Sequence, residues 1–131
     1  RGILILDDCY NSNPEAARAM LEVLETTPAR RRAAVLGEML ELGRFSEELH
    51  RAVGREAVAR GVGLLVAVRG AARYIAEEAV RAGLRPDGAV FFEDPAEAGS
   101  FLRGQLEAGD AVLFKGSRGV RIERALEEFM E

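Results

Sequence analysis

The sequence has 131 residues, 48% hydrophobic and 31% charged, which is enough to bury a core without disulfide or metal support. Its formal net charge of -4 at pH 7 argues against broad electrostatic binding to nucleic acid or to a membrane surface. No apolar run approaches the roughly 20 residues that cross a bilayer, no signal peptide is evident, and one cysteine cannot form an internal disulfide. We therefore expect a cytoplasmic protein whose partners are small molecules or other proteins.

Short apolar strand patterns alternate with helical patterns along the whole chain. The runs rich in β-branched residues or leucine predict strands at residues 3–6, 33–36, 64–68, 89–92 and 111–114. Apolar residues at helical spacing predict helices over residues 17–24, 49–57, 75–82, 98–102 and 122–130. This alternation predicts an α/β fold, a Rossmann-like three-layer α/β/α arrangement with a mainly parallel sheet of about five strands. We expect residues 1–131 to form a single domain.

Three helix starts carry capping signals. Asn13 and Asp94 each precede a proline, and proline suits the first helical position. Ser46 precedes the second helix, and we expect its side chain to cap that helix.

The carboxyl ends of parallel strands share one edge of the sheet, and ligands bind at that edge. Three of the loops that leave this edge carry unusual chemistry, with the sequences "DDCYNSNP", "LGEMLELG" and "KGSRG". We expect the first and the last of them to share one rim of the molecule.

The first of these loops combines acids with both asparagines of the chain. Asp7 and Asp8 can accept hydrogen bonds from ribose hydroxyls or hold a magnesium ion through water, and Asn11 and Asn13 offer donors and acceptors. A solvated turn with Asn13 as a helix cap is the alternative, but it accounts for neither Asp7-Asp8 nor Tyr10-Asn11.

The last of these loops follows a strand with a lysine, glycines and an arginine. Lys115 is the only lysine among 18 basic residues, and an ammonium group is not interchangeable with a guanidinium group. Together with Ser117 and Arg118 it predicts a site for a phosphate or a carboxylate. A glycine-rich turn with two exposed cations is the alternative.

The middle loop carries Glu38 and Glu41 between apolar residues. A short amphipathic turn with solvated acids is the simplest interpretation. His50 follows, with no second histidine or cysteine at the spacing of a metal site, so we expect a surface or capping histidine and no metal site.

Two reaction schemes lack their motifs. The P-loop pattern that cradles nucleotide phosphates is absent. The G-x-S-x-G elbow of hydrolases is absent too, and Cys9 has no activating base nearby in sequence, so it is interpreted as a small residue at a strand end.

Taken together, "DDCYNSNP", "LGEMLELG" followed by His50, and "FKGSRGVRIE" resemble the C-terminal domain of the Mur ligases over nearly the whole chain. The resemblance is to the members that join D-alanyl-D-alanine to UDP-N-acetylmuramoyl-tripeptide with cleavage of ATP. It departs from the usual family pattern at Cys9 and Ser12, where small residues replace serine and alanine. The sequence begins with Arg1 rather than methionine, and we expect it to be a piece of a three-domain cytoplasmic enzyme.

The resemblance implies a mobile lid and a division of labour among domains. ATP and Mg²⁺ would be bound with the central ATPase domain and the UDP group by an N-terminal domain, so this piece alone would bind no cofactor tightly and be inactive. Arg1-Gly2 would be the remnant of an extra edge strand. In the family, ATP phosphorylates the terminal carboxylate of the tripeptide to an acyl phosphate. The amine of the dipeptide then attacks this acyl phosphate.

Carried over by position, the first loop would meet the ribose and phosphate side of the nucleotide. The residues are Asp7 or Asp8 with Tyr10, Asn11 and Asn13. Lys115, Ser117 and Arg118 are assigned to the carboxylate of the dipeptide or to transition-state charge, with Lys115 and Arg118 as the catalytic candidates. Glu38 and Glu41 are assigned to the amine side.

Three alternative interpretations of the sequence remain. A phosphorelay receiver domain would match Asp7-Asp8 and Lys115, but it needs an aspartate after the third strand, which here ends "VAVRG". The C-terminal domain of a folate-glutamate ligase would have histidine at the position of Ser12. The third is a purely structural interaction module.

Overall fold

The computed structural model describes residues 2–10 and 12–131 and contains one five-stranded sheet. Its strand order is β1-β5-β2-β3-β4, and every neighbouring pair is parallel. The strands are β1 (Leu4–Asp8), β2 (Arg32–Gly37), β3 (Leu64–Val68), β4 (Ala89–Phe92) and β5 (Ala111–Lys115). Both the α/β fold class and the parallel sheet are confirmed.

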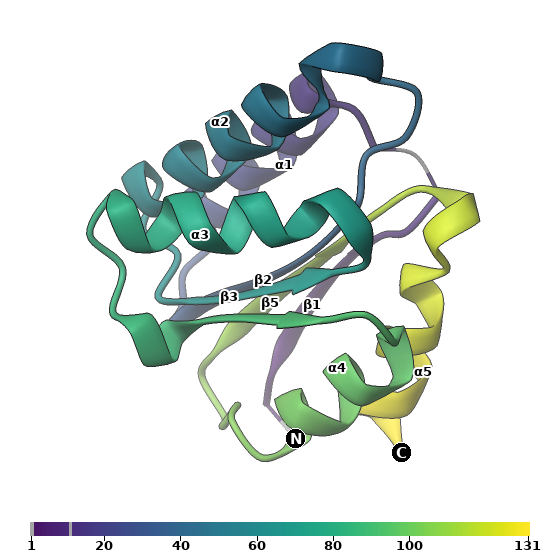
Figure 1. Cartoon of the computed structure of the whole chain (residues 1–131). Coiled ribbons are helices and arrows are strands. Elements are labelled where there is room, and N and C mark those ends of the chain that lie inside the picture. The colour runs from purple at the N-terminus through teal and green to yellow at the C-terminus, as the bar shows by residue number, and fades with distance from the viewer. Residues whose placement is uncertain (1, 11) are drawn as a thin grey trace.

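Helices cover both faces of the sheet, which gives the predicted three layers (Figure 1). One face is covered by α1 (Pro14–Thr26), α2 (Ser46–Ala59) and α3 (Arg73–Arg81), and the other by α4 (Pro95–Arg103) and α5 (Ile122–Met130). Single 3₁₀ turns lie at Gly43–Phe45, Gly70–Ala72, Pro86–Gly88 and Arg118–Val120. None of the helices formed by the described residues is long and apolar enough to cross a membrane.

Alternate residues of the central strands point to opposite helical layers, so the molecule has two apolar cores. In β5, Leu113 packs with α1, α2 and α3, and Phe114 packs with α4 and α5. Burial on both faces explains why β3 is apolar throughout, and why β2 and β5 are apolar apart from Arg32 at the start of β2 and Lys115 at the end of β5. The edge strand β1 is different, because three of its five residues are only partly buried and two are exposed.

The strand and helix predictions are close to the structure, with two corrections. β1 begins at Leu4 and continues through Asp7 and Asp8, so these acids end a strand and do not open a loop. Asn13 and Asp94 cap their helices as predicted, accepting from the N–H groups of Ala16 and Ala96. The prediction for Ser46 is wrong, because a 3₁₀ turn runs directly into α2 and the Ser46 side chain makes no cap.

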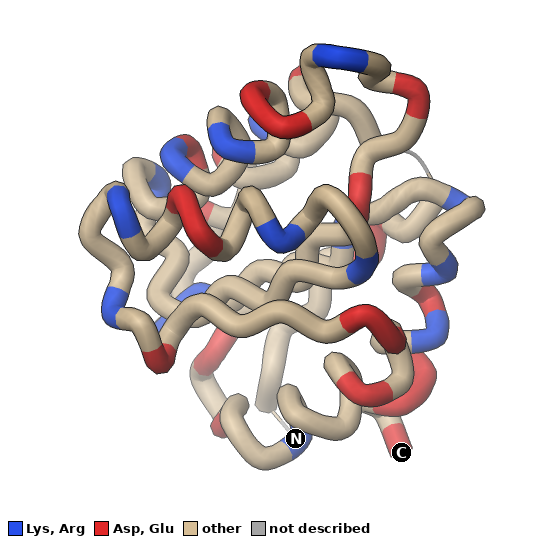
Figure 2. Tube along the Cα trace, in the orientation of Figure 1, with Lys and Arg blue, Asp and Glu red and all other residues tan. Residues whose placement is uncertain are grey.

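The layer of α2 and α3 is held by close packing inside and by ion pairs outside. A Cβ atom at Gly54 would lie well inside contact distance of the Ile75 carbonyl oxygen, so only glycine allows the two helices to approach this closely. On the outer side, Arg51 pairs with Glu77 and Glu78 of α3 at 3.1 and 3.4 Å. Figure 2 shows basic and acidic residues interspersed along these helices, whereas most of each strand is uncharged.

Candidate functional site

The carboxyl ends of β1, β5 and β2 lie side by side, so the three loops of interest leave the sheet together at one edge (Figure 1). Asp8 of β1 is level with Lys115 of β5, and Lys115 is level with Leu36 of β2. The Lys115 ammonium donates to Oδ2 of Asp8 at 2.9 Å. The prediction that the first and last loops share one rim is therefore confirmed.

The Lys115 side chain is buried at this edge and is not part of its exposed surface. Its side chain is 2% exposed, while that of Asp8 is 35% exposed. An ammonium group removed from water needs an opposite charge, and the Asp8 carboxylate supplies one. Lys115 thereby ties β5 to β1 directly beneath the loops.

A pocket of about 290 Å³ opens where the three loops converge. It combines residues from three loops that are separate in the sequence. Its lining residues are Tyr10, Ser12, Asn13, Leu40, Glu41, Ser117, Arg118 and Gly119.

Two polar groups of the last loop have no hydrogen-bond or ion-pair partner among the described residues. The Ser117 hydroxyl oxygen is buried and has no hydrogen-bond partner among residues 2–10 and 12–131. Arg118 is exposed, forms no ion pair within that part of the chain, and lies 5.8 Å from the centroid of the Tyr10 ring. A buried hydroxyl without a partner is costly, and a guanidinium suits a carboxylate or a phosphate. Both features fit an anionic ligand.

The two glutamates of the middle loop point to different places. Glu41 lines the pocket, and its backbone has φ of +64°, a left-handed conformation that is uncommon for residues other than glycine. Glu38 does not line it, because its carboxylate turns to the start of the next loop and accepts from the Ala71 N–H at 2.9 Å. The interpretation of this loop as carrying only solvated acids is wrong for Glu38, which is partly buried.

Some residues of the first loop line the pocket and others do not. Tyr10 and Asn13 line the pocket, although the Asn13 side-chain oxygen is already committed to capping α1. Asp7 is exposed at the end of β1 and Asp8 is paired with Lys115. Asn11, like Arg1, lies outside the described residues.

Cys9 is buried, and the pKa of its thiol is raised far above the usual value, first by burial and then by hydrogen bonding to the Asp7 carboxylate. A thiol held in this protonated form is a poor nucleophile. The interpretation of Cys9 as a small strand-end residue agrees with this. No group of three or more His, Cys, Asp or Glu side chains in the described part of the chain is arranged to hold a metal ion.

The prediction of a surface or capping histidine is wrong for His50, which is fully buried. Its Nε2 accepts a hydrogen bond from the Met39 N–H at 2.9 Å, and its Nδ1 lies 2.7 Å from the Ser46 carbonyl oxygen. Burial lowers the pKa of the imidazole, against the opposing effects of Ser46 and Glu38. Sequence reasoning missed this contact because a lone histidine carries no sign of its partner.

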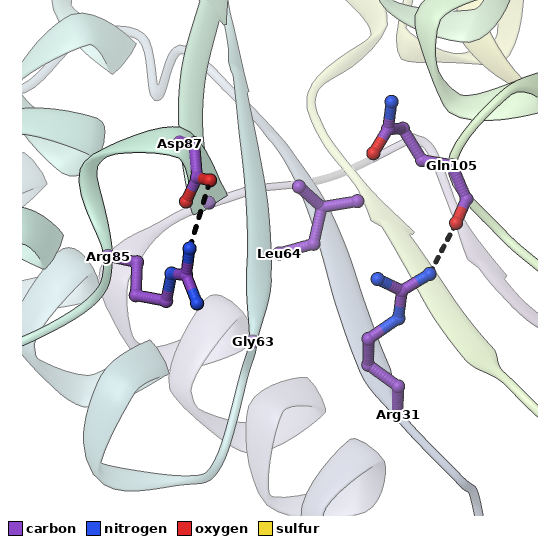
Figure 3. Close-up of a pocket in the computed structure, with 7 residues that line it drawn as sticks. Arg31, Gly63, Leu64, Arg85, Asp87 and Gln105 are labelled. Atoms are coloured by element: carbon purple, nitrogen blue, oxygen red, sulfur yellow. Dashed lines mark hydrogen bonds and ion pairs between the residues drawn. The ribbon is translucent and has the colours of Figure 1, made fainter.

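A second pocket, of about 250 Å³, lies at the opposite edge of the sheet, next to the amino end of β3 (Figure 3). Both of its arginines already have partners. Arg31 donates to the Gln105 carbonyl oxygen and pairs with Asp110, and Arg85 pairs with Asp87 at 3.3 Å. The carboxyl edge is therefore the better candidate for a ligand site.

Comparisons with known proteins identify the family of the chain. Residues 1–118 match the family model described as the glutamate ligase domain of Mur ligases. The UDP-N-acetylmuramoyl-tripeptide–D-alanyl-D-alanine ligase of Mycobacterium leprae is 40% identical over 91% of this chain and 26% of its own length. The enzyme of the same name from Synechocystis is 32% identical over 98% of this chain and 28% of its own length.

Among solved structures, the MurF ligase from Thermotoga maritima in complex with ADP is similar, with a TM-score of 0.82 and 34% identity. The match covers 98% of this chain and 28% of that one. The chain thus spans little more than a quarter of the proteins that it matches.

Proposed function

The chain belongs to the Mur ligase family, as its glutamate ligase domain, and from this premise we propose that it is the lid and amino-substrate domain of a ligase. The ligase would join D-alanyl-D-alanine to UDP-N-acetylmuramoyl-tripeptide in peptidoglycan precursor synthesis, with cleavage of ATP. Two kinds of observation support the proposal: the relatives that carry this activity in their names, and a pocket at the carboxyl edge with an unpartnered hydroxyl and an unpaired guanidinium among the described residues.

The pocket's own chemistry favours the dipeptide as its ligand. D-Alanyl-D-alanine carries a carboxylate at one end and an amine at the other. We assign the carboxylate to Arg118 and Ser117, which can donate to it, and the protonated amine to Glu41, which can accept from it. Leu40, exposed on the same lining, offers an apolar surface for the methyl groups.

The nucleotide side is assigned to the first loop. Asp7 is exposed and can accept from ribose hydroxyls, and Tyr10 offers an aromatic face and a hydroxyl. Asp8, Asn11 and Asn13 complete this assignment. The similar ligase with bound ADP supports a nucleotide in the complete enzyme, where ATP would supply the phosphoryl group that activates the tripeptide carboxylate. The described residues offer no cluster of side chains for Mg²⁺, so the ion is not assigned to this domain.

Lys115 is not one of the residues that line this pocket. In the present conformation its ammonium contacts Asp8 and is outside the pocket lining. We therefore propose that it positions Asp8 and β1, and that Arg118 is the group that meets charge on the reacting molecules. Glu38, with its carboxylate on Ala71, is proposed to position the middle loop and not to contact the amine.

The remaining parts of the proposal concern the whole enzyme. The domain would close on a central ATPase domain of the same chain and would be inactive alone, because the P-loop pattern is absent from it. Residues 1–131 would act as one unit. A cytoplasmic location follows from the use of ATP.

The test compares two arginine variants of the complete ligase in a steady-state assay of ligation. Arg118→Ala should raise the KM for D-alanyl-D-alanine roughly 10- to 100-fold, the loss expected for a charged hydrogen bond. Arg85→Ala, which removes an exposed arginine from the opposite pocket, is the matched control and should leave the KM unchanged. An unaltered KM in Arg118→Ala would contradict the assignment of the carboxylate.

A further inference from the structure

His50 is a buried titratable group that is not part of the pocket lining. It belongs to the second turn of α2, whereas its hydrogen-bond partner, the Met39 N–H, belongs to the middle loop. The contact therefore joins a rigid helix to the backbone of a loop that forms one wall of the pocket.

The partners of the two ring nitrogens define which form of the imidazole is present. A carbonyl oxygen only accepts, so the hydrogen shared between Nδ1 and the Ser46 oxygen, 2.7 Å apart, belongs to Nδ1. A backbone N–H only donates, so Nε2 offers its lone pair to Met39. Only neutral imidazole with hydrogen on Nδ1 makes both bonds. Burial lowers the pKa of His50 and favours this neutral form, while the charge of Glu38 opposes it.

The backbone that His50 holds leads directly into the pocket wall. Met39 is itself buried in the core, and the next two residues, Leu40 and Glu41, line the pocket. Glu41 adopts φ of +64°, and a left-handed conformation of this kind persists only where surrounding contacts hold it.

A second anchor precedes the first. The Glu38 N–H donates to the Val68 carbonyl oxygen at 3.0 Å, and the Glu38 carboxylate accepts from Ala71. The loop is thus fastened to the end of β3 at Glu38 and to α2 at Met39, directly before it turns into the pocket.

We propose that neutral His50 is a positioning residue, which holds the Met39 N–H so that Glu41 and Leu40 face Ser117 and Arg118 across the pocket. Its predicted effect on dipeptide binding rests on the proposed function. The hydrogen bond itself does not.

The test uses the complete ligase with His50→Ala and His50→Gln. Alanine removes the acceptor, whereas the glutamine side-chain oxygen can replace it. In His50→Ala we expect amide exchange at Met39 to accelerate at least tenfold and the KM for D-alanyl-D-alanine to rise roughly tenfold, with kcat less affected. In His50→Gln both values should return to within about threefold of the wild type. Glu48→Gln, on the exposed face of α2, is the matched control and should change neither.

A measurement on the unaltered enzyme covers the case in which His50→Ala does not fold. With ¹⁵N-labelled histidine, the spectrum at neutral pH should report a hydrogen on Nδ1 of His50 and none on Nε2. A hydrogen on Nε2, or unchanged Met39 exchange in a folded His50→Ala enzyme, would overturn the proposal. A wild-type enzyme that fails to ligate the dipeptide would instead refute the proposed function and leave the exchange and ¹⁵N results to decide on His50.

Discussion

The two edges of the sheet carry pockets of similar size but of different character. The carboxyl-edge pocket holds about 290 Å³ and the amino-edge pocket about 250 Å³. At the amino edge, Arg31 forms an ion pair with Asp110, which it shares with Arg30, and Arg85 forms one with Asp87, although Nε of Arg31 has no hydrogen-bond partner among the described residues. At the carboxyl edge, Arg118 forms no ion pair in that part of the chain.

This difference shows that the state of the polar groups, and not the size of the hollow, separates a candidate ligand site from a structural gap. An arginine whose charge is already balanced gains little from a ligand carboxylate, because the new bond must replace an existing one. An arginine in contact only with water and an aromatic ring gains a charged hydrogen bond. We therefore expect substitutions at one edge to have effects that matched substitutions at the other edge do not have.

The largest expected effect on stability belongs to the amino edge. The Asp110 side chain is fully buried, lies 3.0 Å from a guanidinium nitrogen of Arg30, and accepts from the Glu107 N–H at 2.8 Å. Asp110→Ala should lower the free energy of unfolding of the 131-residue chain by about 3 kcal/mol, because it leaves a backbone donor unpaired and a space unfilled. Denaturant unfolding measures this change.

A matched acid at the same edge provides the control. Asp87 is exposed in its pair with Arg85, so Asp87→Ala should change stability by less than about 0.5 kcal/mol. In the complete ligase, the folded Asp110→Ala enzyme should keep the wild-type KM for D-alanyl-D-alanine. A raised KM would mean that the amino edge takes part in binding.

The next effect compares one glycine at each edge. At Gly116, a Cβ atom would overlap the Ile122 side chain at the start of α5, whereas at Gly63 the nearest atom would be 3.8 Å away, on Arg31. Gly116→Ala should therefore destabilise the chain by about 2 kcal/mol through overpacking, and Gly63→Ala by less than about 0.5 kcal/mol. Equal effects on the thermal midpoint would show that α5 does not pack against the loop as described.

The smallest expected effect is the contribution of His50, at the carboxyl edge, to the pH dependence of stability. The pKa of His50 in the folded chain is below its ordinary value of 6.5, so the unfolded chain takes up a proton more readily. Its contribution to stability should be complete above pH 6.5 and should be lost as the pH falls towards the folded-state pKa. Unfolding curves between pH 5 and 8 should show a slope that is smaller in His50→Gln, and an identical slope in both would contradict the buried neutral imidazole.

Much of this fold follows from local sequence patterns. Continuous apolar runs predict β3 and β4 with the observed bounds. In β3 the run reflects burial of the strand on both faces. The end of β1 was less predictable, since Asp7 and Asp8 look like loop residues but continue the strand at the sheet edge, where Asp8 meets Lys115. That pairing depends on strand order, which no local pattern reports.

The site was predicted by residue type better than by geometry. The loop chemistry of Tyr10, Ser117 and Arg118 identified residues that do line one pocket. Glu38 and His50 could not be assigned from the sequence, because their partners, Ala71 and Met39, come from other elements. In both cases the missing information is a tertiary hydrogen bond. We propose that both residues position the middle loop without lining the pocket.

A comparison of D-alanyl-D-alanine with its C-terminal amide in the complete ligase tests directly whether Arg118 binds the dipeptide carboxylate. The wild type should prefer the acid by roughly 100-fold in kcat/KM, and Arg118→Ala should reduce that preference to less than about fivefold, because the variant lacks the charged partner that distinguishes the two. A preference of wild-type size in Arg118→Ala would contradict the claim.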